Sequence, residues 1–317
     1  MNPVIEAEKL VKTFGNNITA LDNVNLSIER GSAFGFLGPN GAGKTTTVRL
    51  LNGLLKPSSG KIRVLEKTVP GESDFLRQKC GVLTDTNLYE RLTAFENLHV
   101  WGRIFEIPQT ELEVRIKRLL EMLGLEERKN NLVSAFSKGM KQKLSIARAL
   151  INDPEIIFLD EPTAGLDPEA AKDIIQYLKH MVKDGKRTVF LCSHRLEEVE
   201  ELCDTIAIIN RGKILIEGSV SGIINSTWKE HHFTIETNCA LGGNLISEIR
   251  NAPQVSACRQ NGSEIELMLK QRNGVSGIIR KILGTGAEIY AVAEKKHDLK
   301  DVYFLMMEKT AVKNEKK

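Results

Sequence analysis

The residues with the clearest chemical content stand at positions 38–46, where the sequence fits the phosphate-binding pattern G-x-x-x-x-G-K-[ST]. Glycines in such a loop let backbone N–H groups turn toward phosphate oxygens, and the following helix adds the positive end of its dipole. Lys44 would neutralise the β- and γ-phosphates, and the hydroxyl of Thr45 would help to hold Mg²⁺. The residues of this stretch are Gly38, Pro39, Asn40, Gly41, Ala42, Gly43, Lys44 and Thr45, which fill the pattern, and Thr46, which follows it.

The segments on either side of this loop support the interpretation. The apolar run 33–37 predicts a buried strand before it, and apolar residues at helical spacing predict a helix over 44–55 after it. Strand, glycine loop and helix is the context that the pattern requires. The alternative is a glycine turn that happens to precede a lysine, and this context disfavours it. The sequence therefore predicts that the chain binds a nucleoside triphosphate.

Two acidic residues, Asp160 and Glu161, follow the apolar run 156–159, which predicts a buried parallel strand. In ATPases with a phosphate loop, an aspartate at the end of such a strand positions Mg²⁺, usually through water, and we expect this of Asp160. Glu161 points elsewhere and can contact the water that attacks the γ-phosphate. The alternative is a turn with two acidic caps, which the upstream phosphate loop disfavours.

A further candidate site lies at Ser137 and Gly139, where a predicted helix begins that continues to about 150. A helix start that offers a hydroxyl group and a bare backbone is another place where an anion can bind.

These residues need a scaffold, and the periodicity of the chain predicts one in two parts. Over 1–218, strands alternate with helices, which predicts an α/β fold with a parallel sheet covered on both faces, preceded by antiparallel strands over 1–31. A helical subdomain is expected at about 86–150. Over 219–317, the order β-α-β-β-α-β predicts a small accessory α+β domain of ferredoxin-like type with one extra helix.

The bulk composition limits the possible classes of protein. With 41% hydrophobic and 27% charged residues, the chain has the composition of a globular protein. Its net charge of +3 is too small to argue for nucleic acid or an anionic membrane surface as a partner. The five cysteines include no C-x-x-C pair, which predicts reduced thiols in a cytosolic compartment. The sequence shows neither a signal-peptide pattern nor the ~18 apolar residues of a membrane span, so we expect a soluble chain.

Several motifs taken together resemble the ATP-binding cassette (ABC) transporter ATPases. Segments 136–140 and 146–150 resemble the signature motif of that family, and segments 159–163, 164–167 and 193–199 follow in the order that the family has. The resemblance covers about residues 4–218. It implies an ATPase with a cassette fold, a mixed sheet with a helical subdomain, and it implies ATP and Mg²⁺ as cofactors.

The resemblance also implies roles for single residues. Glu161 would be the general base, and His194 would contact the γ-phosphate. The residues expected to hold phosphates and Mg²⁺ are Lys44, Thr45 and Thr46.

Three more residues take roles from the resemblance. Phe14 would stack on adenine, with a place in the core as its alternative. Ser137 and Gly139 would reach the γ-phosphate of ATP held by a second subunit. The competent enzyme would then be a head-to-tail dimer with two ATP molecules at its interface.

The sequence departs from the family pattern at two places. Asp85 stands where the family has a glutamine, and a carboxylate there can still bind Mg²⁺ or a water, so Asp85 is a candidate metal ligand. Lys138 and Met140 replace two residues of the ideal signature Leu-Ser-Gly-Gly-Gln. The Ser137 hydroxyl and the Gly139 backbone remain, so we expect activity to remain.

Segment 88–98, together with the Ser-Lys-Gly-Met signature and the small C-terminal domain, resembles subunits of bacterial drug and antibiotic exporters. This resemblance implies an ATPase subunit that drives a separate membrane-spanning permease, cytoplasmic and peripheral at the inner face of the cell membrane. The cargo would be chosen by that partner.

Three alternatives remain open. A non-transport ABC ATPase acting on DNA or ribosomes usually carries coiled-coil arms or two cassettes, and the sequence has neither a heptad run nor a second phosphate loop. A nucleotide-dependent regulatory module without enzymatic activity would not need the intact set of Lys44, Asp160, Glu161 and His194. A GTPase would carry an Asn-Lys-x-Asp guanine motif, which the sequence lacks, and a small-molecule kinase would not need the Ser137 motif.

Overall fold

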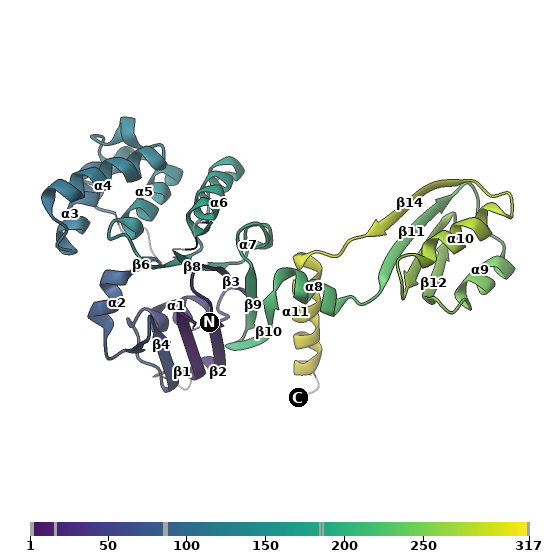
Figure 1. The fold of residues 1–317 in the computed structure, drawn as a ribbon. Helices are drawn as coiled ribbons and strands as arrows, with labels where there is room; N and C mark the ends of the chain where they lie inside the picture. Colours follow the sequence, from purple (N-terminus) through teal and green to yellow (C-terminus); the bar gives the residue numbers. More distant parts are fainter. Residues whose placement is uncertain (1–2, 16–17, 85–87, 184, 186, 316–317) are drawn as a thin grey trace. The chain divides into compact units, whose positions relative to one another are not determined.

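The computed structural model describes residues 3–15, 18–84, 88–183, 185 and 187–315. The chain divides into two compact units, Met1–Val220 and Ser221–Lys317, and each is described by itself. Figure 1 shows the fold of both units with the labels used below.

The first unit is built on a sheet with the strand order β10-β9-β3-β8-β7-β6 in the described part of the chain. Strand β10 is antiparallel to β9, and the other strands run parallel to their neighbours. All residues of β3 and β8 are buried, as expected for parallel strands covered on both faces. The strands are β3 (Ala33–Leu37), β6 (Cys80–Leu83), β7 (Ile156–Asp160), β8 (Thr188–Ser193), β9 (Thr205–Asn210) and β10 (Lys213–Ser219).

This sheet brings the predicted site segments to one edge. In the register of the sheet, Leu37 at the end of β3 is opposite Ser193 at the end of β8, and Asp160 at the end of β7 is opposite Cys192. The segments that follow these three strands therefore leave the sheet side by side, although they are far apart in the sequence.

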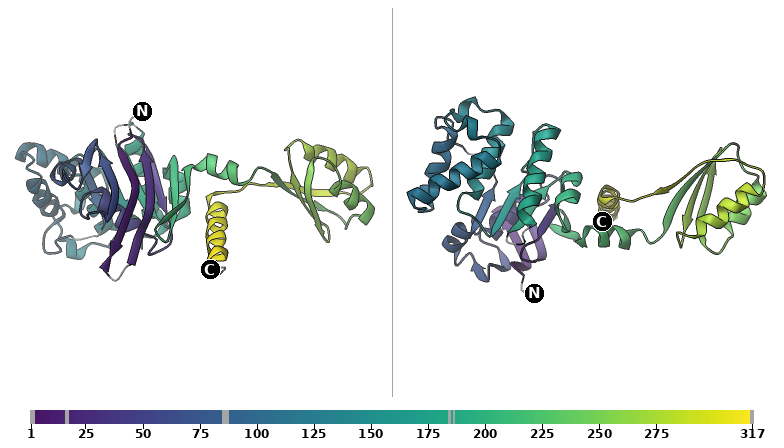
Figure 2. Two further views of the ribbon diagram at one scale, coloured as in Figure 1. Left: turned by 90° about the horizontal axis from the view of Figure 1, so that it is seen from below. Right: turned by 45° about the horizontal axis from the view of Figure 1, so that its top comes forward.

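A second sheet covers the first with the order β2-β1-β4-β5 and antiparallel pairing throughout. Figure 2 shows β1 and β2 lying side by side along most of their length. Leu10 and Ile62 of this sheet belong to one core cluster with Phe36 of β3 and Val48 of the first helix. The strands are β1 (Ile5–Phe14), β2 (Ile18–Ile28), β4 (Ser59–Val64) and β5 (Lys67–Val69). Strand β5 is not apparent from sequence periodicity, because it has only three residues.

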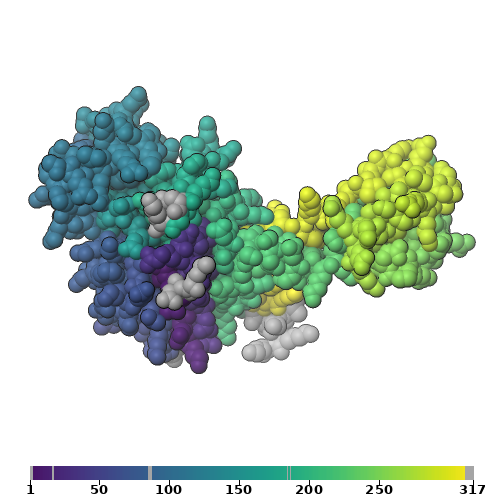
Figure 3. Space-filling model, viewed as in Figure 1, coloured from purple at the N-terminus to yellow at the C-terminus, as the bar shows by residue number. Residues whose placement is uncertain are grey.

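Helices of the first unit surround the sheets, and their ends follow local sequence signals. Thr93 forms a capping box with Glu96, and Asp167 caps a helix that has a proline at its first position. In Figure 3, the residues of α3 and α4 form a separate lobe of this unit, above the lobe of the N-terminal strands. The helices are α1 (Lys44–Leu51), α2 (Ser73–Lys79), α3 (Ala94–Ile104), α4 (Gln109–Met122), α5 (Lys138–Leu150), α6 (Pro168–Val182) and α7 (Leu196–Leu202), with 3-10 turns at Glu126–Arg128 and Val133–Ala135.

One predicted boundary in this unit is wrong. The helix expected over 44–55 ends at Leu51, and Gly53 follows with φ of +76°. A positive φ does not continue an α-helix, so Leu54 and Leu55 lie outside α1 despite their helical spacing.

The second unit contains a sheet of the order β12-β13-β11-β14 in which all pairs are antiparallel. Its core joins Phe233 and Ile235 of β11 to Ile249 of α9 and to Ile278 and Ile282 of α10. Helix α8 is an element that periodicity did not predict. The elements are α8 (Val220–Thr227), β11 (His231–Thr237), α9 (Gly243–Arg250), β12 (Val255–Asn261), β13 (Glu264–Leu269), α10 (Gly274–Leu283), β14 (Ile289–Lys295) and α11 (Leu299–Glu315).

No helix among the described residues is both long enough and apolar enough to cross a membrane.

The thiol groups of the chain differ sharply in burial, which gives a first testable prediction. Cys239 is exposed and the other four cysteines are buried; burial raises the pKa of the Cys80 thiol to about 12. Since the thiolate is the reactive form, we expect iodoacetamide to label Cys239 in the native protein and to reach Cys80, Cys192, Cys203 and Cys258 only after unfolding. Peptide mass spectrometry checks this, and labelling of Cys192 at the rate of Cys239 would contradict the packing.

Candidate functional site

The loop between β3 and α1 contains two glycines whose surroundings leave no room for a Cβ atom. A Cβ atom on Gly38 would lie 2.3 Å from the carbonyl oxygen of Ile209, and one on Gly43 would lie 2.7 Å from that of Ala20. Gly43 also has φ of +112°. The loop therefore wraps tightly against neighbouring backbone at these two positions, just before the start of α1.

A cavity of about 270 Å³ opens at this loop. Besides predicted residues, Ala20 of β2 and Thr84, which directly follows β6, line this cavity. Sequence reasoning did not assign these two to the site. For Thr84 a signal exists, since it follows a predicted strand at the same edge; for Ala20 there is none. The lining residues are Ala20, Pro39, Asn40, Gly41, Gly43, Lys44, Thr45, Thr46, Thr84, Asp160 and Glu161.

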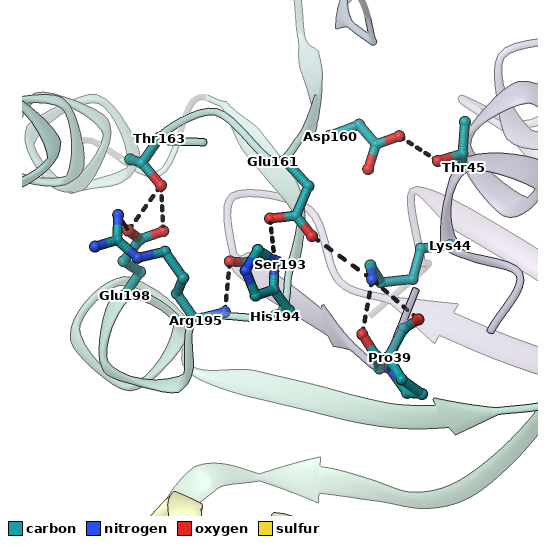
Figure 4. Close-up of polar contacts among 11 residues, drawn as sticks. Pro39, Lys44, Thr45, Asp160, Glu161, Thr163, Ser193, His194, Arg195 and Glu198 are labelled. Atoms are coloured by element: carbon teal, nitrogen blue, oxygen red, sulfur yellow. Dashed lines mark hydrogen bonds and ion pairs between the residues drawn. The ribbon is translucent and has the colours of Figure 1, made fainter. Parts of the chain in front are cut away.

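Lys44 is the main cationic group of the cavity. Its side chain is only 6% exposed, and its Nζ donates to the carbonyl oxygens of Gly38 at 2.7 Å and Pro39 at 3.3 Å. Nζ also lies 3.6 Å from Oε1 of Glu161 (Figure 4). The loop thus holds the ammonium group of Lys44 beside the N-terminus of α1, where it would face an anion bound in the cavity.

Thr45 and Asp160 form a pair of oxygen donors beside this lysine. The Thr45 hydroxyl donates to Oδ2 of Asp160 at 2.5 Å (Figure 4). A hydroxyl and a carboxylate at the edge of a phosphate cavity are the oxygen ligands that Mg²⁺ prefers. The chemistry of this pair fits a phosphate-bound Mg²⁺.

Glu161 projects into the cavity from a strained backbone. Its φ is +51°, which a residue with a side chain rarely adopts, and its N–H donates to the carbonyl oxygen of Cys192 at 2.9 Å. Oε2 lies 2.8 Å from Nδ1 of His194, a side chain that is 54% exposed. Oε1 is buried without a hydrogen-bond donor among the described residues. A buried carboxylate oxygen without a donor fits a site that receives a water or a hydroxyl from a ligand.

Thr163, two residues beyond Glu161, anchors this segment to α7. Its hydroxyl is fully buried and lies 2.7 Å from both carboxylate oxygens of Glu198 (Figure 4). Arg195 lies 2.7 Å from the same carboxylate. Burial raises the pKa of Glu198 above its ordinary value, against the opposite effects of Thr163 and Arg195.

This anchor gives a stability prediction. Thr163→Val keeps the shape but removes the hydroxyl, so a buried carboxylate loses one of its two partners. We expect the free energy of unfolding in urea to fall by about 1–3 kcal/mol near neutral pH. The loss should be smaller in acid, where Glu198 is protonated and its buried charge is gone. Thr68→Val, at an exposed position of β5, is the control. Equal stability of Thr163→Val and the wild type would contradict the role of this contact.

Ser137 and Gly139 lie outside the cavity that Lys44 and Glu161 line. Ser137 is the exposed N-cap of α5, and its hydroxyl accepts the N–H of Met140 at 3.2 Å. The structure therefore brings the phosphate loop, Asp160, Glu161 and His194 together. It leaves exposed Ser137 and half-buried Gly139, here called the Ser137 group, elsewhere on the same unit.

Phe14 and Asp85 are the two other predicted site residues. Phe14 is 42% exposed at the end of β1, so it is not a core residue, and Nζ of Lys12 lies 5.0 Å from its ring centre. It belongs to the hairpin that also carries Ala20 of the cavity wall. Asp85 lies outside the described residues.

A comparison with known sequences finds related proteins. A family profile described as "ABC transporter" matches residues 21–164. The Nod factor export ATP-binding protein I of Ralstonia nicotianae is 40% identical over 223 residues, which are 70% of this chain and 69% of that protein. The bacitracin transport ATP-binding protein BcrA of Bacillus licheniformis is 40% identical over 218 residues, 68% of this chain and 70% of that protein.

A comparison with solved structures agrees with the sequences. The dimer of the ATP-binding cassette MJ0796, in a post-hydrolysis state with ADP and Pi, matches with a TM-score of 0.63 and 29% sequence identity. The match covers 68% of this chain and 98% of that chain.

Proposed function

This chain belongs to the ATP-binding cassette transporter ATPases, and from that premise we propose that it is the ATP-hydrolysing subunit of an exporter. As a member of the family it binds ATP with Mg²⁺, hydrolyses ATP, and works with a second ATPase subunit and a membrane permease. Its fold is the cassette fold that the sequence motifs predicted. The direction of transport rests on a relative that is named for Nod factor export.

One observation supports the assignment of the site. Lys44 and the Thr45–Asp160 pair line one cavity together with Glu161, and His194 contacts Glu161, although these residues come from three separate segments of the chain. A regulatory module that only binds nucleotide would need the loop and the lysine but not a carboxylate held by a histidine.

We assign the roles in hydrolysis from this arrangement. The loop N–H groups and Lys44 bind the β- and γ-phosphates and orient them. Thr45 and Asp160 would hold Mg²⁺, which neutralises charge on the phosphate oxygens when bound. Glu161 takes a proton from the attacking water, and His194 orients the Glu161 carboxylate from Nδ1 and contacts the γ-phosphate.

Other roles follow from the surface residues. Ser137 and Gly139 would bind the γ-phosphate of ATP held by the second subunit, which is supported by the exposure of Ser137 and by the absence of both residues from the lining of their own chain's cavity. Phe14 would stack on adenine beside the Ala20 wall. Asp85 would add a ligand for Mg²⁺ or its water from the segment that follows Thr84.

Two features of the whole chain belong to the same proposal. We place the protein in the cytoplasm, peripheral at the inner face of the membrane, because its permease spans that membrane. We interpret residues 219–317 as an accessory ferredoxin-like domain, which the β-α-β-β-α-β order and the sheet order β12-β13-β11-β14 support.

Affinity purification of the tagged full chain from detergent-treated membranes tests the exporter proposal. We expect one polytopic membrane protein to co-purify in constant ratio and to change the rate of phosphate release from Mg·ATP. A homodimer that turns over ATP fully and binds no membrane protein would contradict the proposal, although it would leave the ATPase intact.

A further inference from the structure

Gln142 makes a buried contact with the segment that carries the proposed base. It lies on α5, is 7% exposed, and its Nε2 donates to the carbonyl oxygen of Pro162 at 2.6 Å. Pro162 directly follows Glu161. The hydrogen bond therefore joins the helix that Ser137 caps to the backbone carbonyl of the residue after Glu161.

The backbone at Glu161 depends on such contacts. A φ of +51° on a residue with a side chain persists only where the surroundings hold it. The N–H of Glu161 is held by the carbonyl oxygen of Cys192, on the sheet side. Gln142 holds the carbonyl of the next residue from the side of α5, so a displacement of α5 changes the aim of Glu161.

The N-cap of α5 is Ser137, the proposed contact with ATP of the second subunit. Ser137 caps α5 five residues before Gln142, which is about 7 Å along the helix axis. The same helix lies beside the first two turns of α6. A Cβ on Gly139 would lie 3.9 Å from Cβ of Ala170, and Nζ of Lys143 lies 3.6 Å from Asp173.

We propose that Gln142 is a positioning residue that transmits the engagement of Ser137 with the partner's ATP to Glu161 of its own chain. This inference rests on the proposed function, because it takes Ser137 as the contact across the dimer and Glu161 as the base. Binding at one nucleotide site then sets the base of the other, and Gln142 is the contact through which it does so.

A double-mutant cycle on ATP turnover tests the proposal. Gln142→Met keeps the length and burial of the side chain but removes its N–H donor, and we expect kcat to fall by about tenfold with KM for ATP within about twofold of the wild type. In the Ser137→Ala background there is no engagement to transmit, so the second substitution should lower kcat by less than about twofold. If kcat of the double variant falls by the product of the two single effects, the proposal is overturned. An unchanged kcat in Gln142→Met would also overturn it.

Matched controls separate positioning from folding. Gln176→Met makes the same change at an exposed glutamine of α6 and should leave kcat unchanged. The affinity for a fluorescent ATP analogue should be alike in Gln142→Met and the wild type. The lost hydrogen bond should lower the melting temperature of Gln142→Met, so kcat is compared well below that temperature.

A second variant keeps the proposal falsifiable if Gln142→Met folds poorly. Gln142→Glu has the same size, and burial raises the pKa of such a carboxyl group. Its protonated form can donate to the carbonyl of Pro162, whereas its ionised form repels it. We expect kcat of this variant, relative to the wild type at each pH, to recover as the pH is lowered from about 9 to about 6. A defect of constant size over that range would overturn the proposal.

The outcomes for the proposed function are distinct. If Glu161→Gln turns over ATP like the wild type, the proposed function fails. If Glu161→Gln is inactive while Ser137 and Gln142 act independently, only the coupling through Gln142 fails.

Discussion

Glu161→Gln is expected to release phosphate from Mg·ATP about a thousandfold more slowly than the wild type. An amide cannot accept the proton of the attacking water, and a positioned general base contributes about 10²–10⁴ in rate. The amide has the size of the carboxyl group, so the backbone at φ +51° and the contact with His194 should be retained. The measurement is phosphate release at saturating Mg·ATP, beside the affinity for ATP, which should stay within about twofold because the phosphate loop is untouched.

Glu197→Gln is the matched control for this experiment. Glu197 is exposed in the first turn of α7, three residues after His194, and makes no part of the cavity. Its substitution should leave turnover unchanged. Equal rates for Glu161→Gln and the wild type would place the base elsewhere and end the assignment of this carboxylate. Because Glu161→Gln binds ATP without consuming it, size-exclusion chromatography with Mg·ATP should also detect a dimer that the wild type forms only transiently.

Lys44→Met is expected to weaken the binding of Mg·ATP by about 10- to 100-fold and to abolish measurable turnover. Nζ of Lys44 is the buried cation of the cavity, and hydrogen bonds to charged phosphate oxygens are among the stronger ones in proteins. Methionine fills the space of the stem but carries no charge. Isothermal titration with Mg·ATP measures the loss directly.

The control for Lys44→Met removes a lysine of the same unit that is far from phosphate. Lys61 is exposed on β4, and Lys61→Met should bind Mg·ATP as the wild type does. Wild-type affinity in Lys44→Met would show that the cavity does not bind the phosphates. Since Lys44 also lies beside Glu161, the melting temperature of the variant without nucleotide should be recorded.

The parts of the site that could be predicted from sequence are those formed by short contiguous segments of the chain. The phosphate loop, Asp160 with Glu161, and His194 each follow a run of apolar residues that is long enough to identify a buried strand. Because parallel strands align their carboxyl ends, the sheet brings these segments together, as the register of Leu37 with Ser193 shows.

The parts that could not be predicted depend on contacts between residues far apart in the chain. Ala20 lines the cavity from a hairpin strand, and nothing in its own neighbourhood indicates phosphate. The hydrogen bonds of Thr163 with Glu198 and of Gln142 with Pro162 join residues 35 and 20 positions apart. In sequence, Gln142 is an ordinary polar residue of a helix, and only its burial shows that it faces the catalytic segment.

The central claim is that two copies of the cassette enclose ATP between the phosphate loop of one and the Ser137 group of the other. A crystal structure of Glu161→Gln with Mg·ATP tests it most directly. We predict that Oγ of Ser137 lies within about 3 Å of a γ-phosphate oxygen of ATP bound by Lys44 of the second copy. A nucleotide-bound structure in which Ser137 is buried within its own unit, out of reach of any second chain, would contradict the account.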